Sequence, residues 1–437
     1  MKLLDNLLKD KVVGVWGMGY LAYTYMLQLQ ANHFKIYLTD LYEEPLKSYR
    51  KGKYPKPEQR YLWSEAGNLP PLDFDGIELK DLHDDIFSEE VHIHIICIPS
   101  RYLAGAYNTN LLHLAEIFKR NASENLKPLI IFQSVSGPGS IQRDFEEKLG
   151  IAKDRYLIGC AFRSDWSLEE FAPFKQKQVI SASSKEALNL IDEFHKMMGV
   201  PTIAAASIKE AEFFENASNA LEFMVRTFFN ELSQAYPDIN VTELTPLITK
   251  KLNLDKCGPG LGTGGFRMPS AVDHILRESF YSDHLALLNA GSDVNLSSML
   301  SYADYLKRKG YKNILLLGVR SVQELMLSPS LIIAESLQRV GVNVGVHAPS
   351  HPPSKLLSMI SGAVYFDFSE GDFSKYDAII LVSDFPEYRL VSQDFISRKV
   401  SGNISVIIDS CGVWSRFSFG DKTQYHRIGD GTLNLMD

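Results

Sequence analysis

The stretch VVGVWGMGYLA, residues 12–22, decides the fold class that the sequence predicts. Positions 12–16 are typical of a short buried strand, two glycines follow at once, and a helix-like segment continues through residue 31. Gly17, Gly19 and Ala22 fit the pattern G-x-G-x-x-G/A, which is weak evidence by itself. Because it follows a strand and opens a helix, it predicts a turn that cradles a dinucleotide pyrophosphate.

The second expected strand, FKIYLTD at 34–40, supports this interpretation. It ends in Asp40, 23 residues after Gly17, where an acidic side chain accepts hydrogen bonds from the adenosine ribose. Its negative charge disfavours a 2′-phosphate, so the sequence predicts NAD as cofactor rather than NADP. Gly17, Gly19, Tyr20 and Leu21 are the expected contacts at the helix N-terminus, which favours anions. The alternative is a flavodoxin-like domain whose glycine turn binds no ligand.

Further strand-like runs lie at 91–100, 127–140 and 155–162, separated by helical segments such as 110–122. Strands that alternate with helices predict βαβ units and a parallel sheet. Pro99, Ser100 and Ser134 fall where two of these strands stop. Since ligands bind along the carboxyl edge of such a sheet, these three residues are predicted to line the cofactor cleft.

The middle of the chain has a different pattern. From 207 to 236 the sequence contains no proline or glycine and has apolar residues at helical spacing, which predicts one long helix. Alternation resumes at 313–319 and continues at 342–349, 376–384 and 404–410. We therefore expect an α/β protein with a Rossmann-type NAD domain at 1–204, a central helical domain at 205–310, and a Rossmann-like α/β domain at 311–437.

Composition excludes several classes of function. The 437 residues are 45% hydrophobic and 22% charged, with a net charge of −8 and no polybasic run, so no nucleic-acid partner is expected. No apolar stretch approaches the ~20 residues needed to span a bilayer, and no secretory signal is visible, so we expect a cytoplasmic protein with no membrane partner. The four cysteines are far apart, so no disulfide is expected. His92 and His94 share one face of a strand, and two strand-edge histidines are favoured over a metal site; no metal is predicted.

Six motifs occur in an order that resembles the UDP-glucose/GDP-mannose dehydrogenase family over nearly the whole chain. They are GMGYLA (17–22), CIPS (97–100), QSVSGPGS (133–140), AEFFENASNALEFMVRTFFNEL (211–232), GPGLGTGGFRMPSA (258–271) and GVRSVQELMLSPSLIIAESLQRVGVNV (318–344). The resemblance implies an NAD domain, a second domain that helps to hold a nucleotide-sugar, and a long helix that forms a homodimer. It also implies a place in polysaccharide precursor synthesis.

The sequence departs from this family where the chemistry occurs. The family oxidises a sugar primary alcohol to a carboxylate in two hydride transfers, through a covalent adduct on a cysteine. Arg267 occupies that cysteine's position, and Glu215 occupies the position of the family's lysine, whereas Asn219 is retained. Cys257, ten residues before Arg267, is interpreted as inert rather than as a displaced nucleophile. The other departures are Ser270, Ala271, Phe162 and Met326.

Glu215 and Arg267 are complementary substitutions at positions that face each other across the sugar in the family. We expect a salt bridge between them, because a buried arginine without a partner would be costly. One interpretation is a purely structural pair. In the other, Arg267 contacts the ligand and Glu215 orients it, with Asn219 completing a catalytic set.

The substrate side is predicted from the same resemblance. Gly262, Gly264 and Gly265 are expected to let the backbone approach the ligand closely. Arg163 is expected to meet a diphosphate, and Trp166 to stack on a base or sugar, with a core position as its alternative. In the pair Asp273-His274, helix geometry turns the two side chains apart by ~100°, so a role for His274 as a base is not favoured.

Three functions are consistent with this sequence. The first is an NAD-dependent oxidoreductase that performs one two-electron step, or a transient oxidation, on a nucleotide-sugar or related ligand. The second is a homologue that binds NAD or a nucleotide-sugar without turnover. The third is a UDP-sugar 6-dehydrogenase with a displaced nucleophile. Loss of the thiol together with its neighbours favours the first.

Overall fold

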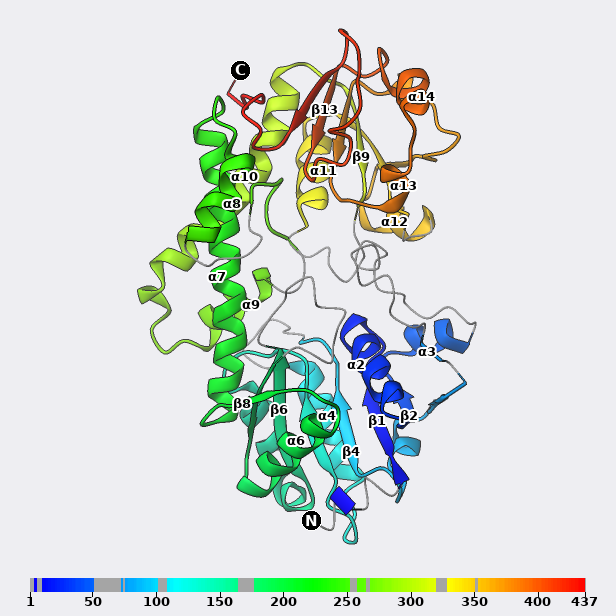
Figure 1. The fold of residues 1–437 in the computed structure, drawn as a ribbon, viewed down its shortest axis with the longest axis vertical. Helices are drawn as coiled ribbons and strands as arrows, with labels where there is room; N and C mark the ends of the chain where they lie inside the picture. Colours follow the sequence, from blue (N-terminus) through cyan, green and yellow to red (C-terminus); the bar gives the residue numbers. More distant parts are fainter. Residues whose placement is uncertain are drawn as a thin grey trace. The chain divides into compact units, whose positions relative to one another are not determined.

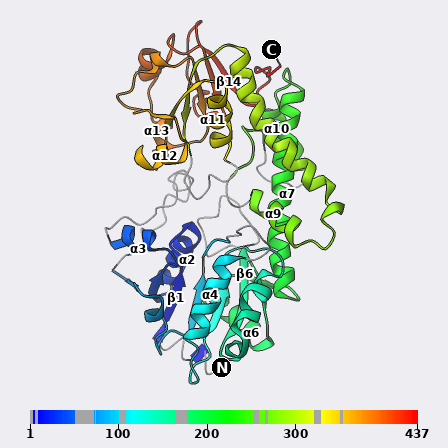
Figure 2. The same cartoon turned by 180° about the vertical axis from the view of Figure 1, so that it is seen from behind.

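The computed structural model describes residues 4–5, 10–50, 72–73, 75–100, 108–163, 177–251, 258–264, 268–319, 328–349 and 353–436. The chain forms two compact units. The first comprises Met1–Ser218 and His274–Phe280, and the second comprises Asn219–Asp273 and Tyr281–Asp437 (Figures 1 and 2). The division into three domains expected from the sequence remains a prediction.

The first unit is built on an eight-stranded sheet with the order β3-β2-β1-β4-β5-β6-β7-β8. Strands β1 to β6 run parallel to one another, whereas β7 is antiparallel to β6 through pairs such as Ala161 with Ile180, and β8 is parallel to β7. The expected parallel sheet is thus confirmed for β1 to β6, and β7 and β8 depart from it. The strands are β1 Val12–Trp16, β2 Lys35–Thr39, β3 Ile77–Leu79, β4 Ile93–Ile96, β5 Leu129–Phe132, β6 Leu157–Arg163, β7 Gln178–Ala182 and β8 Thr202–Ala204.

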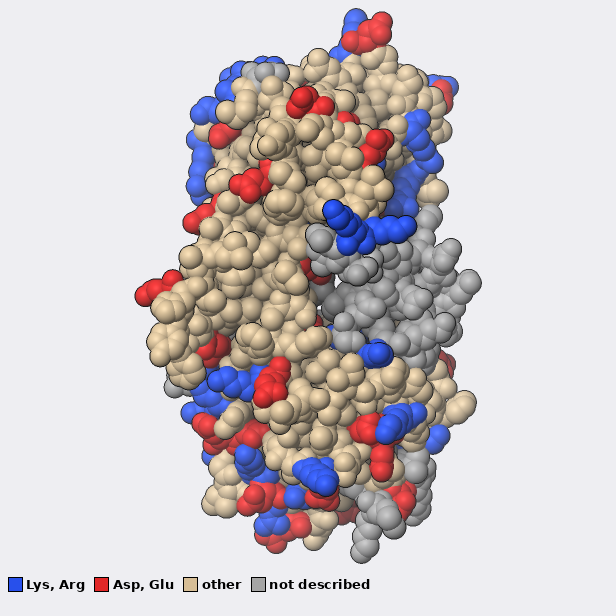
Figure 3. All heavy atoms as spheres, turned by 60° about the vertical axis from the view of Figure 1, so that its left-hand side comes forward, with Lys and Arg blue, Asp and Glu red and all other residues tan. Residues whose placement is uncertain are grey.

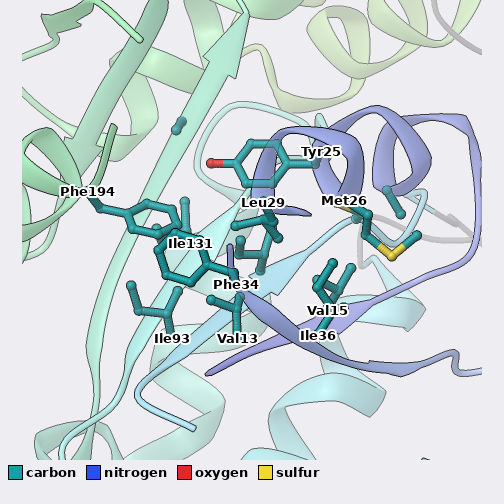
Figure 4. Close-up of a cluster of buried hydrophobic side chains, with 14 of the residues drawn as sticks. Val13, Val15, Tyr25, Met26, Leu29, Phe34, Ile36, Ile93, Ile131 and Phe194 are labelled. Carbon is teal, nitrogen blue, oxygen red and sulfur yellow. The ribbon is translucent and has the colours of Figure 1, made fainter. Parts of the chain in front are cut away.

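Helices cover both faces of this sheet, which explains why its strands are continuously apolar. Successive side chains of β1 point to opposite faces: Val13 and Val15 join one buried cluster, whereas Trp16 joins the other. In Figure 4, Val13 and Val15 lie near Leu29 of α2. The helices are α2 Tyr20–Ala31, α3 Glu43–Arg50, α4 Thr109–Arg120, α5 Glu147–Leu149 and α6 Lys185–Met197, with 3₁₀ turns at His83–Ile86 and Gly150–Arg155 and a π-helical turn at Ile141–Glu146.

The long helix predicted at 207–236 is confirmed as α7, Ile208–Ala235. Its 28 residues correspond to about 42 Å at 1.5 Å per residue. Three further helices follow: α8 Val241–Lys251, α9 Met268–Glu278 and α10 Ala286–Arg308, with a 3₁₀ turn at Ser282–His284. Among the described helices, none is long and apolar enough to cross a bilayer.

The second unit contains a six-stranded parallel sheet with the order β11-β10-β9-β12-β13-β14. Leu315 and Leu317 of β9 face one buried cluster, and Ile314 and Leu316 face another, so this sheet is also covered on both sides. The expected second α/β region is confirmed. Its strands are β9 Asn313–Leu317, β10 Asn343–His347, β11 Val364–Tyr365, β12 Ala378–Leu381, β13 Val406–Asp409 and β14 Gln424–Arg427, and its helices are α11 Pro329–Arg339, α12 Pro353–Met359, α13 Pro386–Arg389 and α14 Gln393–Phe395, with a 3₁₀ turn at Phe373–Lys375 and a π-helical turn at Ile396–Val400.

Candidate functional site

The turn after β1 requires glycine at position 17. Gly17 has φ +104°, and a Cβ there would lie 2.6 Å from the carbonyl oxygen of Cys97, at the end of β4. Its N–H donates to the carbonyl of Thr39 at 2.8 Å. Gly17 therefore lets the ends of β1, β2 and β4 meet at one point of the sheet edge.

Gly19 lies in a different environment. It precedes α2 with φ −84° and ψ −177°, and a Cβ placed on it would meet no atom within 4 Å. The first intrahelical bond runs from Tyr23 N–H to Gly19 O at 3.0 Å, so the N–H groups of Tyr20 and Leu21 precede the hydrogen-bond ladder. Open space over a helix N-terminus is the arrangement that accommodates a phosphate.

Asp40 lies beside this turn. One carboxylate oxygen accepts from Met18 N–H at 2.8 Å, and the other accepts from Tyr42 N–H at 2.9 Å. Burial raises the pKa of Asp40, and the two backbone donors oppose that shift. Each oxygen keeps a second lone pair, so the carboxylate can still accept from ribose hydroxyls.

Pro99, Ser100 and Ser134 all lie beyond the carboxyl ends of β4 and β5. The carbonyl of Pro99 accepts from Asn110 Nδ2 at 2.7 Å, and Ser100 donates its hydroxyl proton to Val135 O. Ser134 N–H donates to Ile96 O at 3.3 Å. Since β4 lies between β1 and β5, the predicted cofactor residues share one edge of the first sheet.

Glu212, on α7, holds the loop that follows β5. Its fully buried carboxylate accepts from Ser136 Oγ at 2.8 Å, Gly139 N–H at 2.6 Å and Ile141 N–H at 3.0 Å. Burial raises the pKa of Glu212 to about 8, against the three donors, which lower it. Sequence reasoning missed this residue as a site residue, although it is the acidic member of the Ala-Glu pair that begins the central-helix motif.

Asn216, one turn further along α7, extends this network. Its Nδ2 donates to Ser136 O at 2.7 Å, and its Oδ1 lies 3.0 Å from His274 Nδ1 on α9. His274 is buried, so the structure gives it a place in the support of the loop. Nothing in the residue spacing indicated this contact, because Asn216 and His274 are 58 positions apart.

Arg143 connects the same region to the end of α9. Its guanidinium donates to both oxygens of Asp144, at 2.7 and 2.8 Å, and to Glu278 at 2.5 and 3.0 Å. Asp144 is fully buried and also accepts from Asn108 N–H at 2.9 Å. Such bidentate pairs fix geometry as well as charge, so residues 274–278 are firmly attached to the first unit.

The predicted catalytic residues are only partly described. Glu215 and Asn219 lie one turn apart on α7, and both are buried, with 4% and 3% of their surface exposed. Arg267, Trp166 and Gly265 lie outside the described residues, so the Glu215–Arg267 salt bridge remains a prediction.

Arg163, at the end of β6, is buried and donates from Nη2 to Thr24 Oγ1 on α2. This contact joins the last residue of β6 to the helix that follows the glycine turn. Its predicted role toward a diphosphate remains untested.

The glycine-rich loop in the second unit is held by side chains from three elements. Asn230 Oδ1 on α7 accepts from Gly260 N–H at 2.7 Å, and Ser410 Oγ accepts from Leu261 N–H at 3.4 Å. Asn295 on α10 bonds Thr263 twice, accepting from its N–H at 2.7 Å and donating to its carbonyl at 2.9 Å. Asn230 and Asn295 were not predicted as site residues.

The Cα of Gly262 packs against the side chain of Met299. This residue has φ +131°, and a Cβ there would lie 2.5 Å from Met299 Cγ on α10. The glycine is therefore required by close packing on this helix, in addition to any approach of the backbone to a ligand. Gly264 is half-buried at the end of the described part of this loop.

The described residues include three cysteines, and none of them forms a disulfide. Burial raises the pKa of Cys97 to about 12 and that of Cys160 well above its ordinary value, so neither is a thiolate near neutral pH. Cys411, in the second unit, is exposed. Cys257 lies outside the described residues.

The architecture, two Rossmann-like sheets joined by one long helix, is that of nucleotide-sugar dehydrogenases, which confirms the expected resemblance at the level of the fold. No family model matches the sequence. Over 262 residues the chain is 24% identical to UDP-N-acetyl-D-mannosamine dehydrogenase of Methanococcus aeolicus, and the match spans 57% of each chain. The aligned region thus covers little more than half of that relative.

Solved structures match over almost the whole length. UDP-D-ManNAc dehydrogenase from Pyrococcus horikoshii superposes with a TM-score of 0.71 at 18% identity, covering 97% of this chain and 100% of that one. UDP-glucose dehydrogenase from Pyrobaculum islandicum superposes with a TM-score of 0.70 at 17% identity, covering 96% of this chain and 97% of that one. The native UDP-N-acetyl-mannosamine dehydrogenase of Staphylococcus aureus superposes with a TM-score of 0.71 at 16% identity, covering 98% of this chain and 100% of that one.

Proposed function

We propose that this chain is an NAD-dependent oxidoreductase that acts on a nucleotide-sugar or a related ligand. We further propose one two-electron step, or a transient oxidation, in place of the four-electron conversion of an alcohol to a carboxylate. The observation that carries the proposal is the turn at Gly17–Gly19, where a closely packed glycine stands next to open space over the start of α2.

The described residues fit NAD. The N–H groups at the start of α2 and the space over Gly19 suit a pyrophosphate, and the lone pairs of Asp40 suit the adenosine ribose. The edge formed by Pro99, Ser100 and Ser134 continues from this turn along the sheet. NAD, when bound, would supply the acceptor for a hydride.

The argument for a single step is the missing thiol. Oxidation of a bare aldehyde needs a nucleophile to add first, and Arg267 stands at the family's cysteine position. Cys97 and Cys160 are buried thiols with raised pKa values, so neither supplies a reactive thiolate. Without such an adduct, oxidation of an alcohol would stop at the carbonyl.

Glu215 is the proposed general base, and Asn219 is proposed to orient the reacting hydroxyl. In this proposal the Glu215 carboxylate takes the proton of the reacting hydroxyl as hydride leaves, and Asn219 orients that hydroxyl. Arg267 would neutralise Glu215 or contact the ligand. Arg163, Trp166, Gly262, Gly264 and Gly265 remain the proposed substrate contacts.

We also propose a homodimer through the central helices. Leu221 and Phe228 of α7 and Leu287 and Leu296 of α10 are exposed apolar side chains. Figure 3 looks toward these helices, over a broad area with few charged side chains. Exposed apolar area of this kind is typical of protein–protein contacts.

The deciding experiment measures NADH formed per nucleotide-sugar consumed, over a panel of UDP- and GDP-sugars. We expect one equivalent per sugar, falling at least a hundredfold in rate in Glu215→Gln and remaining unchanged in Glu231→Gln, an exposed glutamate on the same helix. Two equivalents would instead support a 6-dehydrogenase with a displaced nucleophile. No NADH and no conversion of any nucleotide-sugar to another, together with a melting-temperature rise on NAD addition, would support the non-catalytic binder, whereas conversion without net NADH would support the transient oxidation.

A further inference from the structure

The guanidinium of Arg163 lies against α2, the helix that follows the glycine turn. Arg163 is the last residue of β6, and only 6% of its surface is exposed. Its Nη2 donates to the hydroxyl of Thr24, a buried residue in the second turn of α2 that is 139 positions away in the sequence. Because an arginine stays charged at physiological pH, this contact brings a permanent positive charge to the inner face of the helix.

Thr24 connects this contact to the first turn of α2. Its hydroxyl donates to the carbonyl of Leu21 at 3.0 Å, three residues earlier. A threonine hydroxyl inside a helix commonly bonds a carbonyl of the preceding turn, but here the same oxygen also accepts from a cation. The hydroxyl thus accepts from the guanidinium and donates to the carbonyl, so the three residues form one chain of hydrogen bonds.

The carbonyl at the end of this chain belongs to the peptide unit that carries the N–H of Ala22. The first intrahelical bond of α2 runs from Tyr23 N–H to Gly19 O, so the N–H of Ala22 precedes the hydrogen-bond ladder. Hydrogen bonds in a chain polarise one another, and a bond to a carbonyl makes the N–H of its peptide unit a stronger donor. The charge-assisted bond from Arg163 therefore strengthens a donor at the end of the helix where the pyrophosphate is proposed to bind.

The beginning of α2 lacks the groups that usually neutralise a helix N-terminus. Gly19 provides no side-chain cap, and the first turn contains no acidic residue. The positive end of the helix dipole and the charge of Arg163 therefore act together. Their sum favours a bound anion at this end of the helix.

The surroundings of Arg163 are buried, which lets its charge act on its neighbours. Tyr25 and Cys97 have only 2% and 5% of their surface exposed. Burial raises the pKa of both groups, and the charge of Arg163 opposes that rise in each. Since electrostatic interactions are stronger in the interior than in water, this charge is not screened as a surface charge would be.

We propose that Arg163 is a positioning residue of the cofactor site, which acts through Thr24 and the first turn of α2. It holds the helix against the end of β6 and polarises an N–H group on the side where the pyrophosphate binds. This inference rests on the proposed function, because NAD is the ligand concerned. It is separate from a contact between Arg163 and a substrate diphosphate, and variants of Thr24 distinguish the two roles.

The test measures the Kd for NAD by calorimetry on the full-length protein. Thr24→Val removes the hydroxyl at nearly constant volume and leaves Arg163 in place, and we expect its Kd to rise at least fivefold. Arg163→Gln should also raise the Kd at least fivefold. The double variant should lie within twofold of Arg163→Gln, because both substitutions break the same chain. Thr24→Ser keeps the hydroxyl and should bind NAD within twofold of the unsubstituted protein.

Two controls separate this role from a general loss of charge or stability. Arg155→Gln removes one charge from a partly exposed arginine of the same unit that pairs with Glu124, and should change the Kd by less than twofold. Urea denaturation gives the stability of each variant. A merely structural role would lower the stability of Thr24→Val and leave its Kd for NAD unchanged, which would overturn the proposal.

The outcomes also separate this inference from the proposed function. If the unsubstituted protein binds NAD and both Thr24→Val and Arg163→Gln bind it equally well, the inference is wrong and the proposed function stands. If the double variant shows the product of the two single effects, the residues act independently and the chain is likewise refuted. If the unsubstituted protein does not bind NAD, both the inference and the proposed function fail.

Discussion

The carboxylate of Glu212 accepts a hydrogen bond from the hydroxyl of Ser136 at 2.8 Å, across 76 positions of sequence. The same carboxylate accepts from the N–H groups of Gly139 and Ile141. One buried side chain of the long helix therefore fixes the loop after β5, which contributes to the proposed cofactor edge.

Substitution of Glu212 by Gln should lower the free energy of unfolding by about 2–3 kcal/mol. The reason is that the side-chain NH2 group of glutamine, which only donates, replaces a carboxyl oxygen that accepts hydrogen bonds. Urea denaturation at pH 6 measures this. Glu231→Gln on the same helix is exposed and should change it by less than about 0.5 kcal/mol. Equal effects of the two substitutions would contradict the role of Glu212.

Glu212 should also make stability depend on pH. Its folded pKa of about 8 lies above the ordinary value of 4.5, so the folded state holds the proton more tightly. The stabilisation is fully present below about pH 4.5 and is lost as pH rises through 8. The stability difference between the unsubstituted protein and Glu212→Gln should therefore shrink from pH 5 to 8, by up to ~1.4 kcal/mol per pH unit. A difference that stays level or grows would refute this assignment.

The two glycines of the turn should respond differently to alanine. Gly17→Ala forces a Cβ against Cys97 O at positive φ and should cost about 3 kcal/mol or more of stability. Gly19→Ala meets no atom within 4 Å, so stability should change by less than about 1 kcal/mol. Its methyl group would occupy the proposed phosphate space, so the Kd for NAD, measured by calorimetry, should rise at least tenfold. Undiminished NAD affinity in Gly19→Ala would count against a pyrophosphate site at the start of α2.

Asp40→Asn should narrow the preference for NAD over NADP. The amide keeps an oxygen that can accept a backbone hydrogen bond but removes the charge that repels a 2′-phosphate. We expect the ratio of the two Kd values to fall at least tenfold, equivalent to about 1.4 kcal/mol. An unchanged ratio would mean that Asp40 does not face the ribose.

Asn295→Ala should loosen the glycine-rich loop, because both backbone groups of Thr263 lose their partner. The expected loss is about 2–3 kcal/mol in the free energy of unfolding. Asn289, an exposed residue of the same helix, provides the control: Asn289→Ala should have almost no effect. Comparable losses in the two variants would show that helix propensity, rather than the Thr263 contacts, is responsible.

The predicted strands agree best with the structure where a strand is buried on both faces of its sheet. The apolar runs that predicted β1, β4, β5, β9, β12 and β13 became central strands, since strands covered on both faces are continuously apolar. The strands β3, β7, β8, β11 and β14 were not predicted. β14 is the edge strand QYHR, which carries little apolar signal, and the antiparallel direction of β7 follows from chain routing rather than from composition.

The sequence by itself determined the class of fold and the position of the glycine turn, because strand and helix periodicity and the spacing from Gly17 to Asp40 act over a few tens of residues. Tertiary structure alone decided which side chains hold the loops: Glu212 with Ser136, Asn295 with Thr263, and Arg143 with Glu278. It also placed Arg163 of β6 against Thr24 of α2. Each such contact joins residues that are distant in the chain, and a hydrogen bond depends on a distance of about 3 Å that no local pattern specifies.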